Sequence, residues 1–175
     1  DYNVAVGQFA LEENTTANRN TAVGTFTAEK TTTGSYNTAF GGWALQTNTT
    51  GASNTACGHN VLNASQTASN NTGAGGSNTA IGYQSGKDVS TGASNVFVGY
   101  RAGMGQVNTG NNNLFIARSN VSAGNDACWI YGDNEGDVFQ GNNDSHWATT
   151  SDQRLKKDIV DNTKGLEVID KIKVR

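Results

Sequence analysis

A five-residue phrase, Asn-x-[Ala/Phe]-x-Gly, returns at a nearly fixed interval through residues 3–117. Successive copies begin 17, 17, 17, 24, 17 and 18 residues apart, and the long interval holds an insertion around residues 66–75. The last copy is degenerate, because it ends in Ala instead of Gly. The copies begin at Asn3, Asn20, Asn37, Asn54, Asn78, Asn95 and Asn113. A period of this length is too short for a domain, so it indicates a stack of repeated units.

Each repeat unit has the same internal order. The phrase alternates in the manner of a strand, and its Gly predicts a corner with positive φ or a close approach to a neighbour. A second apolar segment follows, as in residues 9–13, 43–47 and 60–64, and we predict a short second strand there. A turn rich in Thr, Gly, Ser and Asn completes the unit. Such residues supply left-handed conformations and side-chain hydrogen bonds to the backbone.

These units predict an all-β fold, a parallel β-roll or β-solenoid with about 17 residues per coil. At roughly 3.3 Å per residue, one repeat is long enough for one flattened coil. Stacked coils about 4.8 Å apart would place Asn on Asn and Ala on Ala. We expect Ala, Val, Ile and Phe to fill the interior. A disordered Asn/Thr/Gly tract is the alternative, but disorder does not require apolar residues at a fixed offset from Asn.

The composition agrees with a thin stack better than with a globular core. The chain has 175 residues with 22 Gly, no Pro and 15% charged residues, and 35% of its residues are hydrophobic. Globular domains usually contain about 45–50% apolar residues. A single stack of small side chains would leave an apolar face in water, which favours association of several copies around an axis.

Charge and apolar patterning exclude several classes of function. The net charge is −3, and no clustered basic face indicates nucleic-acid binding. No apolar run is long enough for membrane insertion, and residues 1–13 lack the basic start of a signal peptide. Cys57 and Cys128 are too few for a disulfide scaffold, and Cys57 occupies a repeat position that holds Val, Phe or Ile elsewhere.

The sequence predicts no cofactor and no metal site. His59 and His146 are far apart in the sequence, and neither has Cys or carboxylate neighbours at ligand spacing. The acidic residues of the region after the repeats lack the ligand spacing of a calcium loop, so we interpret them as solvated turns. These residues are Asp126, Asp133, Glu135, Asp137 and Asp144.

The repeats resemble the head repeats of trimeric autotransporter adhesins. They resemble more closely the N-T-A-[VI]-G … A-L … T-G repeats of phage tail fibres, over roughly residues 1–117. The resemblance implies a homotrimeric, usually left-handed parallel β-roll. It also implies a location on the virion surface or otherwise outside the cell. The partners implied are further copies of the chain and a glycan or protein on the host cell surface.

The pattern changes over residues 118–148. Two strand-like pieces, "ACWIYG" and "DVFQG", predict a short hairpin that caps the stack. A solenoid needs such an end, because its last coil otherwise presents an open sheet edge.

Residues 149–175 carry the first helix-compatible spacing in the chain. Ser151 and Asp152 form a plausible N-cap, and "KGLEVIDKIKV" spaces its apolar residues as a short α-helix does. The phrase "SDQRLKKDI" resembles the opening of the endosialidase-type intramolecular chaperone domain of phage tailspikes and fibres. That family assists trimerisation and then cuts itself off. The resemblance implies that Ser151 is the nucleophile and Lys156 its general base.

The serine–lysine chemistry is physically sound. A Ser hydroxyl needs a base, and a partly desolvated Lys can have its pKa lowered far enough to serve as one. The attack is intramolecular, so it requires no substrate pocket. We therefore expect a single self-cleavage rather than a turnover enzyme. The family's domain is longer than the segment after Ser151, so the resemblance implies a piece of a longer fibre.

The sequence thus predicts a structural and adhesive viral fibre, with receptor contacts at its turns or at the inserted loop 63–76. A cellular trimeric adhesin is the first alternative, but that class continues into a coiled coil and membrane anchor, where this chain has "SDQRLKKDI". A carbohydrate-degrading tailspike is the second. It would need paired Asp or Glu residues in a groove, and the repeats contain few carboxylates.

Overall fold

The computed structural model describes residues 2–63, 75–104, 109–119, 128–132 and 135–140. The chain separates into two compact units, Asp1–Ser145 and His146–Arg175. All described residues belong to the first unit. The short helix predicted within residues 149–175 therefore lies outside the described residues.

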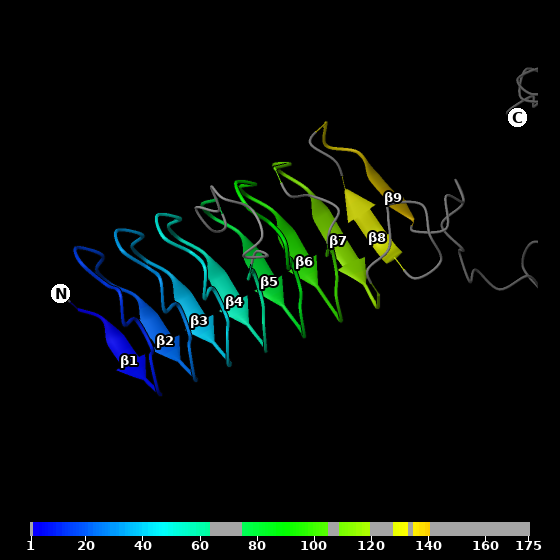
Figure 1. Ribbon diagram of the computed structural model, residues 1–175. Coiled ribbons are helices and arrows are strands. Elements are labelled where there is room, and N and C mark those ends of the chain that lie inside the picture. Colours follow the sequence, from blue (N-terminus) through cyan, green and yellow to red (C-terminus); the bar gives the residue numbers. More distant parts are fainter. Residues whose placement is uncertain (1, 64–74, 105–108, 120–127, 133–134, 141–175) are drawn as a thin grey trace, which may run out of the picture. The chain divides into compact units, whose positions relative to one another are not determined.

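Within the described residues, nine strands form one sheet whose order follows the chain (Figure 1). Strands β1 to β7 are parallel, and each pairs with the strand one repeat later, so that Ala22 faces Ala39 and Ala39 faces Ala56. The fold is therefore the all-β parallel solenoid that the period predicted. The strands are β1 (Val4–Val6), β2 (Thr21–Val23), β3 (Thr38–Phe40), β4 (Thr55–Cys57), β5 (Thr79–Ile81), β6 (Val96–Val98), β7 (Leu114–Ala117), β8 (Cys128–Gly132) and β9 (Val138–Gln140).

The repeated Asn forms a buried ladder that explains why it recurs. The Oδ1 atom of Asn37 accepts a hydrogen bond from the backbone N–H of Asn54 at 2.9 Å. Its Nδ2 atom donates to the carbonyl of Gly51, in the turn of its own coil, at 2.9 Å. Asn37 is 1% exposed. Asn20, Asn78 and Asn95 make the same two kinds of bond, so these side chains close their own coil and bind the next one.

The Gly of the phrase forms the predicted corner. Gly41 has φ +128° and Gly58 has φ +132°. A Cβ atom on Gly58 would lie 2.8 Å from the carbonyl oxygen of Gly82 in the next coil. Both the positive φ and the close packing of successive coils therefore require Gly.

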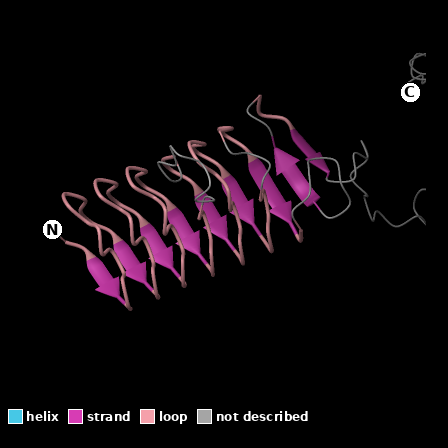
Figure 2. Ribbon diagram, viewed as in Figure 1, coloured by secondary structure: helices cyan, strands magenta, loops and turns pink. Residues whose placement is uncertain are grey.

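The prediction of a second strand in each coil is wrong. In the described residues, the segment after each Gly corner is loop and not strand (Figure 2). In this segment Trp43 and Leu45 have φ +58° and +53°, outside the β region. The backbone still bonds to its neighbours, since the N–H of Leu45 donates to Val61 O at 2.9 Å. Burial of Ala44 and Leu45, both 0% exposed, offsets the unfavourable backbone conformation.

The interior matches the predicted one in part, because Ala, Val and Phe residues are buried there but no Ile of the described chain is. Strand residues at the centre of the phrase are buried, as Ala39 is, but the Val, Ile and Phe after them point outward, as Phe40 and Ile81 do. Leu residues of the turn segment, such as Leu45 and Leu62, which the prediction did not include, share the core with the buried Ala, Val and Phe. The reason is the two-residue period of a strand, which allows only the middle residue of three to face the core.

In the coil that begins at Asn95, the large and the small core residue change places, and the large ring also packs against the coil before it. Phe97 replaces the buried Ala of earlier strands and is 0% exposed. The positions that hold Leu in several earlier coils are Gly86 and Gly103 here. A Cβ atom on Gly86 would lie 2.8 Å from Phe97 Cδ2, and one on Gly103 would overlap the same ring. Phe97 with Gly103 therefore occupies about the same core space as Ala with Leu in earlier coils, with the large and the small residue exchanged.

The stack ends in the hairpin that the sequence predicted. β8 pairs antiparallel with β7, and β9 pairs antiparallel with β8. A register shift between Ile116 and Ala117 accompanies this change of direction. Phe115 continues the core, and its ring stacks between those of Phe97 and Tyr131 at centroid distances of 6.1 and 6.5 Å.

We expect Asn37→Ala to lower the free energy of unfolding by about 1–3 kcal/mol, because it leaves the buried N–H of Asn54 without an acceptor. Thr50→Ala, at an exposed turn residue of the same coil, should change it by less than about 0.5 kcal/mol. Urea unfolding at one protein concentration measures both variants. Equal effects of the two substitutions would contradict a structural role for the Asn ladder.

Candidate interaction surfaces

The outer face of the parallel sheet is apolar along much of its length. It consists of the strand residues on either side of the buried central one. Phe40, Ile81 and Val96 are 57%, 45% and 37% exposed. The exposed residues Thr38 and Thr55 lie beside them, and each adds only one hydroxyl group to this surface. A row of exposed apolar side chains on a flat sheet is typical of a surface that packs against another protein.

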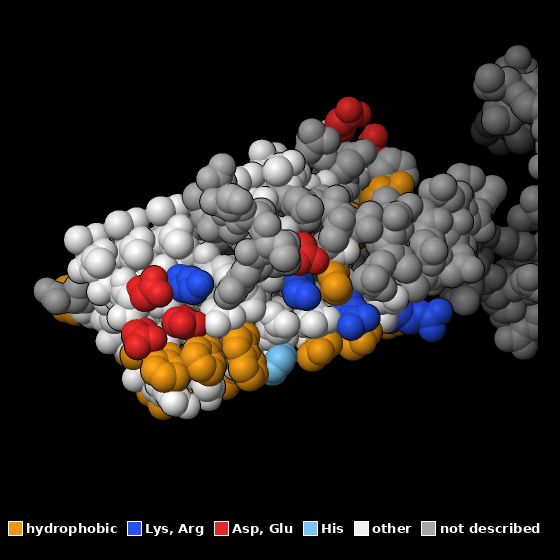
Figure 3. Space-filling view, in the orientation of Figure 1, with side chains coloured by type: hydrophobic (Ala, Val, Ile, Leu, Met, Phe, Trp, Pro, Cys, Tyr) orange, Lys and Arg blue, Asp and Glu red, His pale blue; other side chains and the backbone are white. Residues whose placement is uncertain are grey.

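An aromatic ladder runs along the edge next to this sheet face. Successive ring centroids lie 4.8 to 5.8 Å apart. The space-filling view shows it as a band of hydrophobic side chains with one histidine within it (Figure 3). Its members are Phe9, Phe26, Trp43, His59, Tyr83 and Tyr100. All these pairs are stacked except Trp43 and His59, whose rings are tilted by 60°, so the ladder offers mainly ring edges to a partner.

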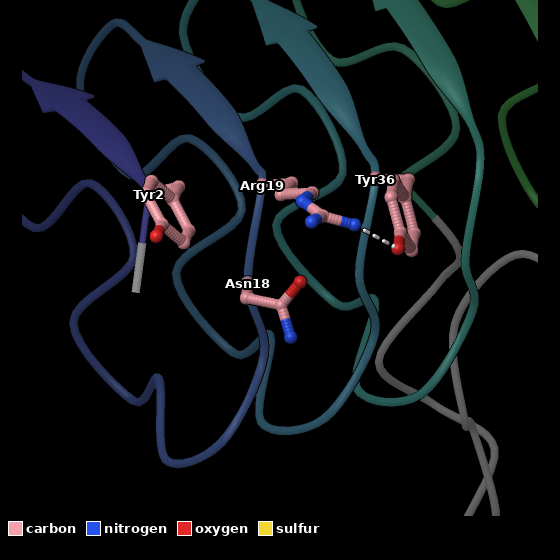
Figure 4. Close-up of a pocket in the computed structure, with 4 residues that line it drawn as sticks. All are labelled: Tyr2, Asn18, Arg19 and Tyr36. Atoms are coloured by element: carbon pink, nitrogen blue, oxygen red, sulfur yellow. Dashed lines mark hydrogen bonds between the residues drawn. The ribbon is translucent and has the colours of Figure 1, made fainter.

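An open hollow of about 320 Å³ lies over the turns of the first coils, lined by Tyr2, Asn18, Arg19 and Tyr36. Tyr2, Arg19 and Tyr36 occupy the same position in three successive repeats. Arg19 donates a hydrogen bond from Nη1 to the Tyr36 hydroxyl, and its guanidinium lies 5.3 Å from the centroid of that ring. Figure 4 shows Arg19 directed toward Tyr36, with Asn18 on the same side of the chain.

The two cysteines have opposite environments. Cys57 is exposed on the outer sheet face and Cys128 is buried, and both are free thiols. Burial raises the pKa of the Cys128 thiol, and a hydrogen bond with the backbone of Ile130 lowers it in part. Cys128 therefore stays protonated and unreactive, whereas Cys57 is open to a labelling reagent.

The function cannot be taken from relatives. No protein-family model, curated protein or solved structure gives a significant match to this chain. The functional argument therefore depends on the motifs of the sequence and on the surfaces of the solenoid.

The residues predicted to cleave the chain, Ser151 and Lys156, lie outside the described residues, as does most of the loop 63–76 that was predicted to contact a receptor. The structure therefore places neither the Ser–Lys pair nor that loop. Among the described residues, no group of three or more His, Cys, Asp or Glu side chains could hold a metal ion. The part of the chain that the structure describes contains no helix long and apolar enough to cross a membrane.

The sequence predicted an exposed apolar face without locating it, and it predicted neither the aromatic ladder nor the hollow. The aromatic ladder changes position between Trp43 and His59, from the second residue after the Gly to the first, so no single column of the repeat is aromatic throughout. The hollow was detectable, because Tyr2, Arg19 and Tyr36 stand where later repeats have Ser or Asn.

Proposed function

We propose that this chain is part of a homotrimeric viral fibre, most similar to a phage tail fibre, with a structural and adhesive role. The structural support for the trimer is the outer sheet face. Its apolar side chains, Phe40, Ile81 and Val96, extend over several coils in the direction of the stack. Three such faces packed around an axis would remove them from water, which stabilises by about 25 cal/mol per Å² of apolar surface.

The viral part of the proposal is supported by sequence motifs. The repeats are similar to those of phage tail fibres, and "SDQRLKKDI" at residues 151–159 is similar to the start of the self-cleaving chaperone of such fibres. A stack whose coils are joined by a buried ladder of Asn side chains resists unfolding along its length. Such a rod suits an appendage that must hold a receptor-binding surface away from the virion, outside the cell.

The oligomeric state tests this proposal. We expect the intact protein to have the native mass of three chains. Phe40→Asp should raise the concentration at which the trimer dissociates by at least about tenfold, because it places a charge in an apolar interface. Thr50→Asp adds the same charge at an exposed turn and should leave the trimer intact. A wild-type protein that is monomeric at micromolar concentration would refute the proposal.

Cys57 gives a second readout on the same samples. Its thiol is exposed on a single chain, so a maleimide reagent should modify it rapidly in a monomer. In a trimer that packs through the outer sheet face, the same thiol should be protected until the chains dissociate. A stable trimer in which Cys57 reacts at the rate of an unfolded chain would place the interface elsewhere.

A further inference from the structure

The hollow lined by Tyr2, Asn18, Arg19 and Tyr36 has a composition that the fold does not require. The same column of the repeat holds Ser53, Ser77, Ser94 and Asn112 in later coils. All seven residues of this column have positive φ, between 56° and 65°. Ser and Asn suit such turns better than Tyr or Arg. Three large side chains in a row at this position are therefore unexpected for a purely structural turn.

At other positions of the repeat, burial or ring contacts offset the conformational cost of a positive φ. The residues of the hollow have fewer such contacts. Leu45 gains complete burial in the core, and Trp43 gains ring contacts on both sides in the aromatic ladder. Tyr36, by contrast, is 53% exposed. Unfavourable backbone conformations whose cost is not offset by packing contacts are more frequent at binding sites than in structural turns.

The cation in the hollow has no acidic partner in the described chain. Arg19 interacts with the hydroxyl and the ring of Tyr36, and no carboxylate of the described residues pairs with it. A guanidinium has five N–H donors in a planar fork, and the Tyr36 hydroxyl takes one of them. The remaining donors match the two oxygens of a carboxylate, which Arg binds in a bidentate manner.

The other two residues supply a flat surface and a hydrogen-bonding group. Arg19 turns toward Tyr36, so the guanidinium leaves the ring of Tyr2 uncovered (Figure 4). The side-chain amide of Asn18 makes no hydrogen bond to any described residue, and it lines the same hollow. An amide offers both donors and an acceptor, which suits a ligand rich in hydroxyl groups.

We propose that this hollow binds an acidic sugar, a pyranose that carries a carboxylate. The carboxylate is held by the guanidinium of Arg19, the apolar face of the sugar ring lies against Tyr2, and a hydroxyl group bonds to the amide of Asn18. The aromatic ladder is a poorer site for such a ligand, because its rings cover each other: Tyr83 and Tyr100 stack at 5.5 Å with 10° between their planes.

The site deepens the proposed function, since it would give the fibre its contact with the host surface, and its biological meaning rests on that proposal. A single sugar in an open hollow binds weakly. A trimer repeats the site three times, and several weak sites on one rod can raise the overall affinity for a surface by about 10²- to 10⁴-fold. Binding of a single sugar to one chain does not depend on the trimer.

The experiment is an NMR titration of the intact protein with matched monosaccharides. The acidic probes are methyl β-D-glucuronide and the methyl α-glycoside of N-acetylneuraminic acid. Methyl β-D-glucoside, which differs from the first probe only at the carboxylate, is the neutral control. We expect at least one acid to bind, and the glucoside to bind at least about tenfold more weakly than the glucuronide if the glucuronide is bound.

Three variants locate the binding. Arg19→Gln should weaken binding of the acid by at least about tenfold, and Tyr2→Ser, which introduces the residue of later repeats, should weaken it while preserving the turn. Arg101→Gln is the matched control, because Arg101 lies 5.2 Å from the ring centroid of Tyr100 but lines no part of the hollow. It should bind as the wild type does.

The proposal is overturned if neither acid binds, if the glucuronide binds and the glucoside binds equally well, or if Arg101→Gln weakens binding as much as Arg19→Gln does. The native mass of each sample is measured in parallel. A trimer without acid binding would contradict only the sugar site, whereas a monomer that binds the acid would contradict only the trimeric fibre.

Discussion

We expect Phe97→Ala to lower the free energy of unfolding by about 3–5 kcal/mol, which is the range for removal of a fully buried Phe. The Phe97 ring is 0% exposed and stacks on Phe115. Its loss leaves a cavity beside Gly86 and Gly103, where no side chain can fill the space. A solenoid coil is thin, so few neighbouring side chains can shift to close it.

Gly103→Leu should also destabilise, for the opposite reason, because its side chain would overlap the Phe97 ring. The backbone itself accepts Leu at this repeat position, since Leu45 and Leu62 have φ +53° and +46° and Gly103 has φ +66°. The double variant Phe97→Ala/Gly103→Leu restores the pairing of coil three, where Ala39 and Leu45 share the core. It should therefore be more stable than the sum of the single variants predicts, by about 1–3 kcal/mol.

Urea unfolding of the wild type, both single variants and the double variant, at one protein concentration, measures this coupling. The fixed concentration matters because the stability of an oligomer depends on it. If the two effects simply add, the exchange of large and small residues between coils is coincidental. In that case the pairing of Phe97 with Gly103 would not be explained by the core space that they share.

The features predicted correctly from the sequence are those that depend on the chemistry of a single position in the repeat. The Asn ladder requires Asn, because no other side chain closes its own coil and caps the next N–H as Asn37 does. The corner requires Gly, as the φ of +128° at Gly41 shows. Such residues recur at the same place in the repeat, so both the period and the strand in each coil could be predicted from them.

The features predicted wrongly depend on several positions at once. Positive φ at Trp43 and Leu45 is not a preference of either residue, so apolar spacing alone favoured a second strand. The exchange at Phe97 and Gly103 is visible only when two columns of the repeat are compared. The outward direction of Phe40 follows from the strand period, but hydrophobicity argued for the interior. That error matters for function, because the outer sheet face is the surface that a trimer would bury.

The second large effect concerns the C-terminal segment, whose predicted catalytic residues are known only from their motif. In the complete gene product that contains "SDQRLKKDI", we expect the wild type to split beside Ser151 and Ser151→Ala to remain whole. A hydroxyl is required for nucleophilic attack on the neighbouring carbonyl, and a methyl group cannot replace it. Thr150→Ala removes the adjacent hydroxyl as a matched control and should still split. Intact mass measurement distinguishes the products directly.

The base can be tested separately from the nucleophile. Lys156→Arg keeps the positive charge, but a guanidinium does not lose its proton in proteins and so cannot accept one from Ser151. We expect this variant to stay whole, whereas Lys157→Arg, one residue further along, should split as the wild type does. If both Lys variants split, Ser151 uses another base. If the wild type also remains whole while forming a stable trimer, the segment is a permanent foot of the fibre, and the proposed self-cleavage is wrong.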